Sequence, residues 1–138
     1  MSQLLHFTKW IESLTPRTLS DINKHYSKDV YFKDPFNEFT SIERITLVFS
    51  HMFENLEKPH FVFINTIESG EGAFLTWDFI FAIKGKEMKI HGGSLLRWDT
   101  EGKINYHRDY WDVGEELLLK IPVVKSFYRL IYNRFKLT

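Results

Sequence analysis

The spacing of the apolar residues changes at Pro59, and this change constrains the fold more than any other feature of the sequence. Before Pro59, apolar residues recur every three or four positions, the period of a helix with one buried face. After it they alternate with polar residues in the segments 60–68, 72–83, 87–98 and 103–112, which are separated by turn-forming residues. Helices followed by a run of strands indicate an α+β domain with an antiparallel sheet. The two helical stripes are Leu4, Phe7, Trp10, Ile11 and Leu14, and Ile42, Ile45, Phe49, Met52 and Leu56.

Three further segments complete the predicted order of elements. Thr15-Pro16 ends the first helix and begins a short second helix, with Leu19, Ile22 and Tyr26 on its inner face. Residues 30–34 form a brief strand that closes at Asp34-Pro35, because the residue before a proline favours extended backbone. A last helix is expected after Pro122. The predicted order is therefore helix, helix, strand, helix, four strands and helix.

Composition limits the chemistry available to the chain. Its 138 residues predict a single domain over 1–138, and the 17% of aromatic residues, with thirteen Phe, indicate a large aromatic core or an apolar cavity. Eighteen basic residues balance eighteen acidic ones, so net charge does not favour nucleic acid as a partner. The chain has no cysteine and its histidines lack metal-ligand spacing, so we expect neither a metal nor another cofactor.

The N-terminal segment has no basic leader followed by an apolar run, and no apolar stretch approaches the length of a membrane span. We therefore expect a soluble protein of the cytoplasm.

A set of short motifs resembles one known superfamily. The motifs are the Asp-Pro strand at 30–35, the closing hairpin at 95–104 and the His-Arg-Asp-Tyr-Trp-Asp strand at 107–112. In this order they resemble the SnoaL-like branch of the nuclear transport factor 2 superfamily, including its ketosteroid isomerase-like and limonene epoxide hydrolase-like members. The resemblance implies a cone-like α+β barrel, in which a curved antiparallel sheet wraps around the N-terminal helices. It covers residues 4–112, and residues 113–138 form a C-terminal helical extension.

The hairpins predict which strand residues share a face. A three-residue turn at 84–86 and a four-residue turn at 99–102 place Asp78, Gly92 and Asp109 in one row across the sheet. In the resembling families this face of the last strand lines a cavity. The residues then expected at the cavity are Thr76, Asp78, Ser94, His107, Asp109 and Trp111.

The limonene epoxide hydrolase-like members imply a pair of carboxylates that activates a water and protonates the epoxide. Asp78 and Asp109 match that pair. Thr76 stands where that family has an arginine, and Phe32 stands where it has a tyrosine, so water positioning would differ here.

The ketosteroid isomerase-like members imply a different base. Asp34 matches their proton-shuttling aspartate, and Trp10 and Ser94 stand at the positions that donate hydrogen bonds to the oxyanion. The candidate catalytic residues are thus Asp34, Asp78, Asp109 and His107. The candidate ligand-binding residues are Trp10, Phe32, Phe49, Thr76, Ser94 and Trp111.

The same residues also fit structural roles. Asp34 before a proline is typical of a turn, and Asp78 and Asp109 could each belong to an ion pair, with His107 as one partner. Two hypotheses of function follow. The chain is a cofactor-independent isomerase, cyclase or hydrolase acting on a small apolar molecule, or it is a non-catalytic module for ligand binding or dimerisation.

The second face of the sheet and the last helix suggest partners. The face predicted to lie outside is apolar, and we therefore predict a homodimer through the sheet; the alternative is that the C-terminal helix covers this face. That helix joins apolar residues to four basic ones, and we expect it to dock on the domain rather than to contact a membrane. The outer residues are Leu75, Trp77, Phe79, Phe81, Leu95, Tyr106 and Tyr110, and the basic ones are Lys125, Arg129, Arg134 and Lys136.

Overall fold

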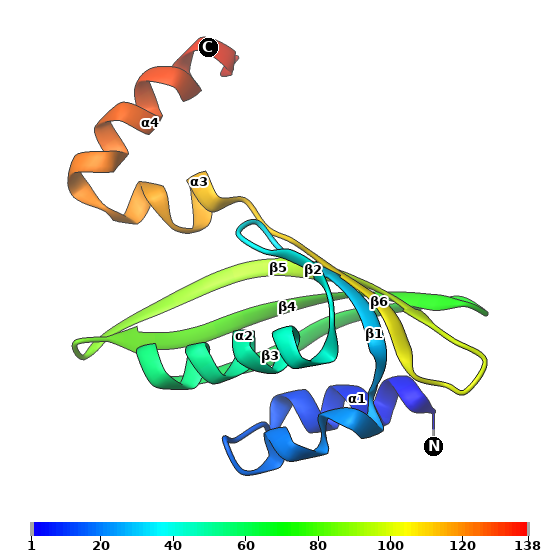
Figure 1. Ribbon diagram of the computed structural model, residues 1–138. Helices are drawn as coiled ribbons and strands as arrows, with labels where there is room; N and C mark the ends of the chain where they lie inside the picture. Colours follow the sequence, from blue (N-terminus) through cyan, green and yellow to red (C-terminus); the bar gives the residue numbers. More distant parts are fainter. Residues whose placement is uncertain (1, 138) are drawn as a thin grey trace.

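One curved, six-stranded sheet organises the chain, as the computed structural model of residues 2–137 shows (Figure 1). Its strand order is β2-β1-β6-β5-β4-β3. Two helices and a 3-10 helix, η1, precede the long strands, and the C-terminal extension follows them. The elements are α1 (Gln3–Glu12), η1 (Thr18–Lys24), β1 (Tyr26–Lys33), β2 (Glu38–Thr40), α2 (Ile42–Asn55), β3 (Glu57–Glu68), β4 (Gly72–Ile83), β5 (Lys86–Trp98), β6 (Ile104–Tyr110), α3 (Val113–Glu116), the 3-10 helix η2 (Leu118–Lys120) and α4 (Pro122–Phe135).

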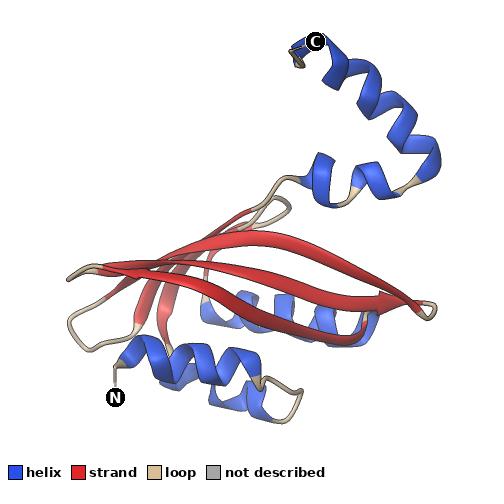
Figure 2. Cartoon of the chain, turned by 180° about the vertical axis from the view of Figure 1, so that it is seen from behind, coloured by secondary structure: helices blue, strands red, loops and turns tan. Residues whose placement is uncertain are grey.

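Helices α1 and α2 lie on one face of the sheet, where the predicted apolar stripes are buried, except that Met52 and Leu56 are half-buried (Figures 1 and 2). Each begins at a serine whose side chain accepts a backbone hydrogen bond, Ser2 from Leu5 at 3.2 Å and Ser41 from Arg44 at 3.3 Å. The core between helices and sheet includes Phe7, Ile11, Ile45, Phe49, Val30, Leu75 and Leu96.

The sheet is mixed rather than purely antiparallel, because β1 pairs in parallel with β6. The strand β1 begins at Tyr26, a residue that the sequence had placed on the second helix. The short strand β2, which pairs with β1, was not predicted. The parallel pairing sets Phe32 opposite His107 and so brings β1 beside β6.

The β4–β5 hairpin departs from the predicted register by one residue. Its turn has two residues, Lys84 and Gly85, both with positive φ of 51° and 79°, as a type I′ turn requires. Ile83 therefore pairs with Lys86 rather than Glu87. A slip of one residue reverses the faces of a strand. The predicted orientation of β4 is consequently wrong: Thr76 and Asp78 face away from the helices, and Leu75, Trp77, Phe79 and Phe81 face towards them.

The β5–β6 hairpin departs by two residues, which leaves the faces unchanged. An irregularity between Arg97 and Trp98 shifts the pairing, so that Asp109 lies opposite Ser94 instead of Gly92. His107 pairs with Leu96. Both side chains of β6 thus stay on the concave face of the sheet.

The C-terminal helix α4 extends away from the sheet and buries none of its residues (Figures 1 and 2). The expectation that it docks on the domain is therefore wrong for the body of this helix. Within residues 2–137, no helix is long and apolar enough to cross a membrane.

Candidate functional site

A cavity of about 370 Å³ lies between the concave face of the sheet and helices α1 and α2. Its wall is mostly apolar and rich in aromatic residues, with side chains from α1, α2 and the strands β1, β3, β4, β5 and β6. The polar residues that line it are Asp34, Ser94, His107 and Asp109. Aromatic residues of the wall include Phe32, Phe49, Phe61, Trp77, Phe79 and Trp111.

The Asp109 carboxylate is the centre of a hydrogen-bond network at this wall. The Ser94 hydroxyl donates to Asp109 Oδ1 at 2.5 Å, and His107 Nε2 lies 2.7 Å from the same oxygen. Both partners are buried, with Ser94 on the strand beside Asp109 and His107 two residues before it. One oxygen of the carboxylate is therefore fixed from two sides.

Two aromatic residues complete the network. Trp77 Nε1 donates to Ser94 Oγ at 2.8 Å, and the hydroxyl of Tyr26 lies 2.9 Å from His107 Nδ1. Burial, and secondly the charge of Asp109, raise the pKa of Tyr26 well above its ordinary value, so the phenol stays protonated. It can then donate to His107 Nδ1, which leaves the imidazole proton on Nε2, facing Asp109. Every donor in the network points towards the carboxylate.

The second carboxylate oxygen, Asp109 Oδ2, has no hydrogen-bond partner among residues 2–137. The side chain is 19% exposed and lines the cavity. A fixed carboxylate with one uncommitted oxygen in an apolar cavity is the arrangement that a general base needs.

Asp34 also lines the cavity, at the β1–β2 loop, but its hydrogen bonds are those of a turn. Its Oδ1 accepts from the backbone N–H groups of Phe36 at 2.8 Å and Asn37 at 2.7 Å. The Asn37 side chain also contacts Oδ2 at 3.2 Å. The sequence analysis gave Asp34 either a catalytic role or a role in a turn, and these hydrogen bonds are those of a turn residue.

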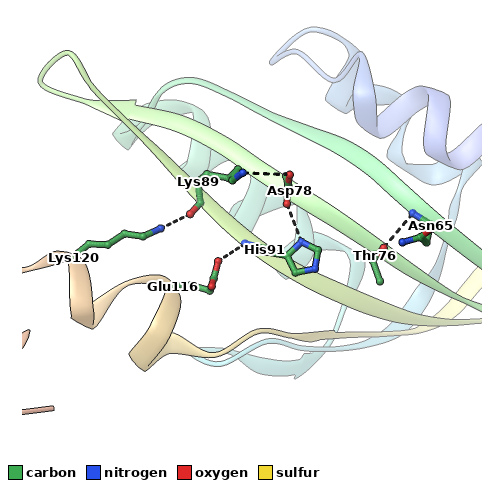
Figure 3. A network of polar contacts seen from close by, with 7 residues as sticks. All are labelled: Asn65, Thr76, Asp78, Lys89, His91, Glu116 and Lys120. Atoms are coloured by element: carbon green, nitrogen blue, oxygen red, sulfur yellow. Dashed lines mark hydrogen bonds and ion pairs between the residues drawn. The ribbon is translucent and has the colours of Figure 1, made fainter. Parts of the chain in front are cut away.

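Asp78 lies on the outer face of the sheet, as Figure 3 shows. It contacts His91 Nδ1 at 2.8 Å and Lys89 Nζ at 3.9 Å. On the same face, Thr76 accepts a hydrogen bond from the backbone N–H of Asn65 at 3.1 Å. The prediction that Asp78 and Thr76 face the cavity is wrong. The sheet separates Asp78 from Asp109, so these two residues do not form a carboxylate pair.

The other predicted ligand contacts divide into two groups. Phe32, Phe49 and Trp111 line the cavity, whereas Trp10 does not. Trp10 stacks on His25 at a centroid distance of 4.5 Å and donates its indole N–H to the carbonyl of Thr18 at 2.9 Å. Its donor is thus occupied by the backbone and does not serve the cavity.

Tyr26 and Trp77 are members of the network that the sequence analysis missed. The Lys84-Gly85 pair could have revealed Trp77. A glycine after a polar residue favours a two-residue turn, and the register that follows from this turn places Trp77 on the cavity side of β4. No comparable signal marked Tyr26, which begins β1 directly after a 3-10 helix. Among residues 2–137, no three His, Asp or Glu side chains gather as metal ligands would.

Comparison with known proteins agrees with this architecture. The SnoaL-like domain family matches residues 7–107. Three solved structures illustrate the fold. An NTF2-like protein from Burkholderia pseudomallei is 16% identical, with a TM-score of 0.72, covering 88% of this chain and 98% of that one. An LEH-like epoxide hydrolase from M. tuberculosis is 14% identical, with a TM-score of 0.71 and coverage of 91% and 95%.

The third structure is a protein with a ketosteroid isomerase-like fold from Catenulispora acidiphila, in complex with trimethylamine. It is 19% identical, with a TM-score of 0.67 and coverage of 80% of this chain and 88% of that one. Among curated proteins, none matches the sequence significantly. The family match spans most of the chain, and the chain therefore belongs to the SnoaL-like domain family.

Proposed function

We propose that the chain binds a small apolar molecule in the cavity and that Asp109 removes a proton from it, in a reaction that needs no cofactor. The observation that carries this proposal is the geometry of one carboxylate. Its Oδ1 is fixed by Ser94 and His107, while its Oδ2 is uncommitted within an apolar wall. The rest of the wall is largely apolar, so an apolar substrate would be held against this oxygen.

The geometry favours a carbon acid as the substrate over an epoxide. Epoxide opening by the route considered above needs two carboxylates, one to activate water and one to protonate the epoxide. Asp78 lies on the other face of the sheet, and Asp34 is engaged by its own turn. A single base that takes a proton and returns it to another carbon is sufficient for an isomerase or a cyclase.

Trp111 is a candidate to bind the polar group of such a substrate. It lines the cavity, and its indole N–H has no hydrogen-bond partner among the described residues. As Asp109 Oδ2 takes the proton, the charge that develops on a substrate carbonyl oxygen would be stabilised by this donor. The neighbouring Phe36 ring, 5.6 Å from Trp111, packs against its edge and helps to orient it.

The substrate class follows from size and polarity. A cavity of about 370 Å³ with an aromatic wall suits a polyketide, a terpenoid, a steroid-like molecule or a fatty-acyl compound. A single polar group on the ligand would meet the carboxylate.

The test uses nitrobenzisoxazole, a compact apolar carbon acid whose ring opens when a base takes its proton. We expect the protein to accelerate this reaction and Asp109→Asn to reduce the rate by about 100-fold or more, the usual contribution of a general base. Asp78→Asn is the matched control, because it makes the same change on the outer face. Equal rates for the two variants would contradict the proposal. If the wild type and Asp109→Asn both bind the probe and neither converts it, the chain is a binding module.

The outer face of the sheet supports a second candidate, a module that dimerises. Phe74 and Tyr110 are 36% and 43% exposed and lie near each other across the strands. The guanidinium of Arg108 lies over Tyr110, at 4.7 Å from the ring centroid. Exposed aromatic residues with arginine are typical of interfaces. Sedimentation velocity of the wild type and of Tyr110→Glu tests for a homodimer through this face.

A further inference from the structure

The helix α4 presents an apolar stripe to solvent. Its members are between 64% and 86% exposed, whereas an apolar helix face is normally buried against a domain. Figures 1 and 2 show the helix extending from the sheet, on the side opposite α1 and α2. The stripe consists of Val123, Phe127, Leu130, Ile131 and Phe135.

The charge of this part of the chain is distinct from that of the rest. Residues 117–138 contain five Lys and Arg and no acidic residue, whereas residues 1–116 contain thirteen basic and eighteen acidic residues. Lys125 and Arg129 are four positions apart, so they share the helix face opposite the apolar stripe, and Lys136 directly follows the helix. The helix is therefore both amphipathic and cationic.

The segment that precedes α4 is fixed to the domain. Beyond the end of β6, the free edge of β5 is capped by the extension (Figure 3). Glu116 accepts the backbone N–H of His91 at 2.6 Å, and Lys120 Nζ donates to the carbonyl of Lys89. The ring of Tyr128 fills the space that a Cβ on Gly114 would need. Only the contact of Tyr128 involves α4 itself, and it leaves the apolar stripe exposed.

We propose that α4 docks this stripe on a negatively charged lipid surface and lies in its interface. Fourteen residues span about 21 Å, too short to cross the ~30 Å hydrocarbon core but suited to lying along it. Aliphatic and Phe side chains would enter the acyl boundary, and the cations would contact lipid phosphates. Tyr132, which is 47% exposed, suits the level of the headgroups.

A second copy of the chain fits this stripe less well. The exposed aromatic part of the outer face carries Arg97 over Tyr106 and Arg108 over Tyr110, so a cationic helix would meet like charge there. The inference goes beyond the proposed function and does not depend on the chemistry of Asp109. Leu117, which lines the cavity, precedes α4 by five residues, so a docked helix would bring the cavity near the lipid.

The test is co-sedimentation of the full chain with vesicles. We expect binding to vesicles of phosphatidylcholine with phosphatidylglycerol, weak binding to phosphatidylcholine alone, and weaker binding as salt rises. Ile131→Asp should weaken binding at least tenfold, because it places a charge in the stripe. Ile67→Asp is the matched control, since Ile67 is 71% exposed and Ile131 is 65% exposed.

Charge substitutions distinguish docking on anionic lipid from non-specific hydrophobic adsorption. The double variant Lys125→Gln/Arg129→Gln should weaken binding about thirtyfold, from about 1 kcal/mol for each cation near an anionic surface. Arg17→Gln/Lys28→Gln makes the same charge change on exposed residues elsewhere and should bind as wild type. Equal effects of the two double variants would overturn the proposal. So would an absence of vesicle binding together with a dimer that Ile131→Asp dissociates, which would identify α4 as a contact between copies.

Discussion

Ser94 and Asp109 lie directly opposite each other on β5 and β6, and the serine hydroxyl donates a 2.5 Å hydrogen bond to the carboxylate. Strand pairing therefore sets the position of Asp109 Oδ1, the same oxygen that His107 contacts. Because Trp77 donates to Ser94 and the Tyr26 hydroxyl contacts His107 Nδ1, the whole network converges on one charge. Such a network orients the carboxylate before any ligand binds.

Ser94→Ala should destabilise the protein. The Ser94 hydroxyl is the acceptor for the Trp77 indole N–H, and its loss leaves that buried donor without a partner. We expect the free energy of unfolding to fall by about 1–3 kcal/mol, measured by urea denaturation. In a Trp77→Phe background the donor is absent, so the same serine change should have a smaller effect. Additive effects of the two substitutions would contradict the hydrogen bond.

Tyr26→Phe should change how stability depends on alkaline pH. The pKa of Tyr26 in the folded protein lies well above the ordinary value of 10.0, because burial and then Asp109 oppose its ionisation. Above pH 10 the unfolded chain loses this proton while the folded chain keeps it, so the unfolded state binds fewer protons. Stability is unaffected by this group below pH 10 and falls by about 1.4 kcal/mol per pH unit above it.

The phenylalanine variant removes that slope but keeps the other tyrosines. The difference between wild type and Tyr26→Phe, followed by urea denaturation between pH 8 and pH 11, should therefore shrink as pH rises. A constant difference over that range would show that Tyr26 ionises equally in both states.

The helices and the long strands could be predicted from the sequence because their apolar periods are long and regular. Both apolar stripes lie on helices, α1 and α2, and the strands after Pro59 follow in the predicted order. The face of β4 could not be predicted from alternation alone. Asp78 and Trp77 exchange places when a turn changes from three residues to two, and only backbone conformation at Lys84 and Gly85 decides between them.

The site was predicted in part for the same reason. His107 and Asp109 lie at the cavity because a shift of two residues leaves faces unchanged. Tyr26 was missed because its contact with His107 spans 81 positions and depends on the parallel pairing of β1 with β6. Local patterns carry no information on that pairing. The exposure of α4 was missed because an apolar stripe predicts burial but does not indicate which surface covers it.

Lys84→Asn should stabilise the hairpin that sets the β4 face. Lys84 has a φ of 51°, in the left-handed region that asparagine tolerates better than lysine. Asn-Gly is the favoured pair for a type I′ turn, so we expect a gain of up to about 1 kcal/mol by urea denaturation. Lys84→Val is the opposing variant, because a β-branched side chain disfavours positive φ, and it should destabilise. The same sign for both variants would contradict the turn assignment.

Gly92→Ala should disturb both the core and the network. A Cβ on Gly92 would lie 2.6 Å from Trp77 Cη2 and 3.0 Å from Trp111 Cβ, so the Trp77 indole must move. That movement strains the packing and pulls Nε1 away from Ser94, and we expect a loss of about 1–3 kcal/mol in unfolding free energy. Gly70→Ala is the matched control, because a Cβ there meets nothing within 4 Å. If both variants unfold at the same urea concentration, Trp77 does not occupy the cavity wall beside Gly92.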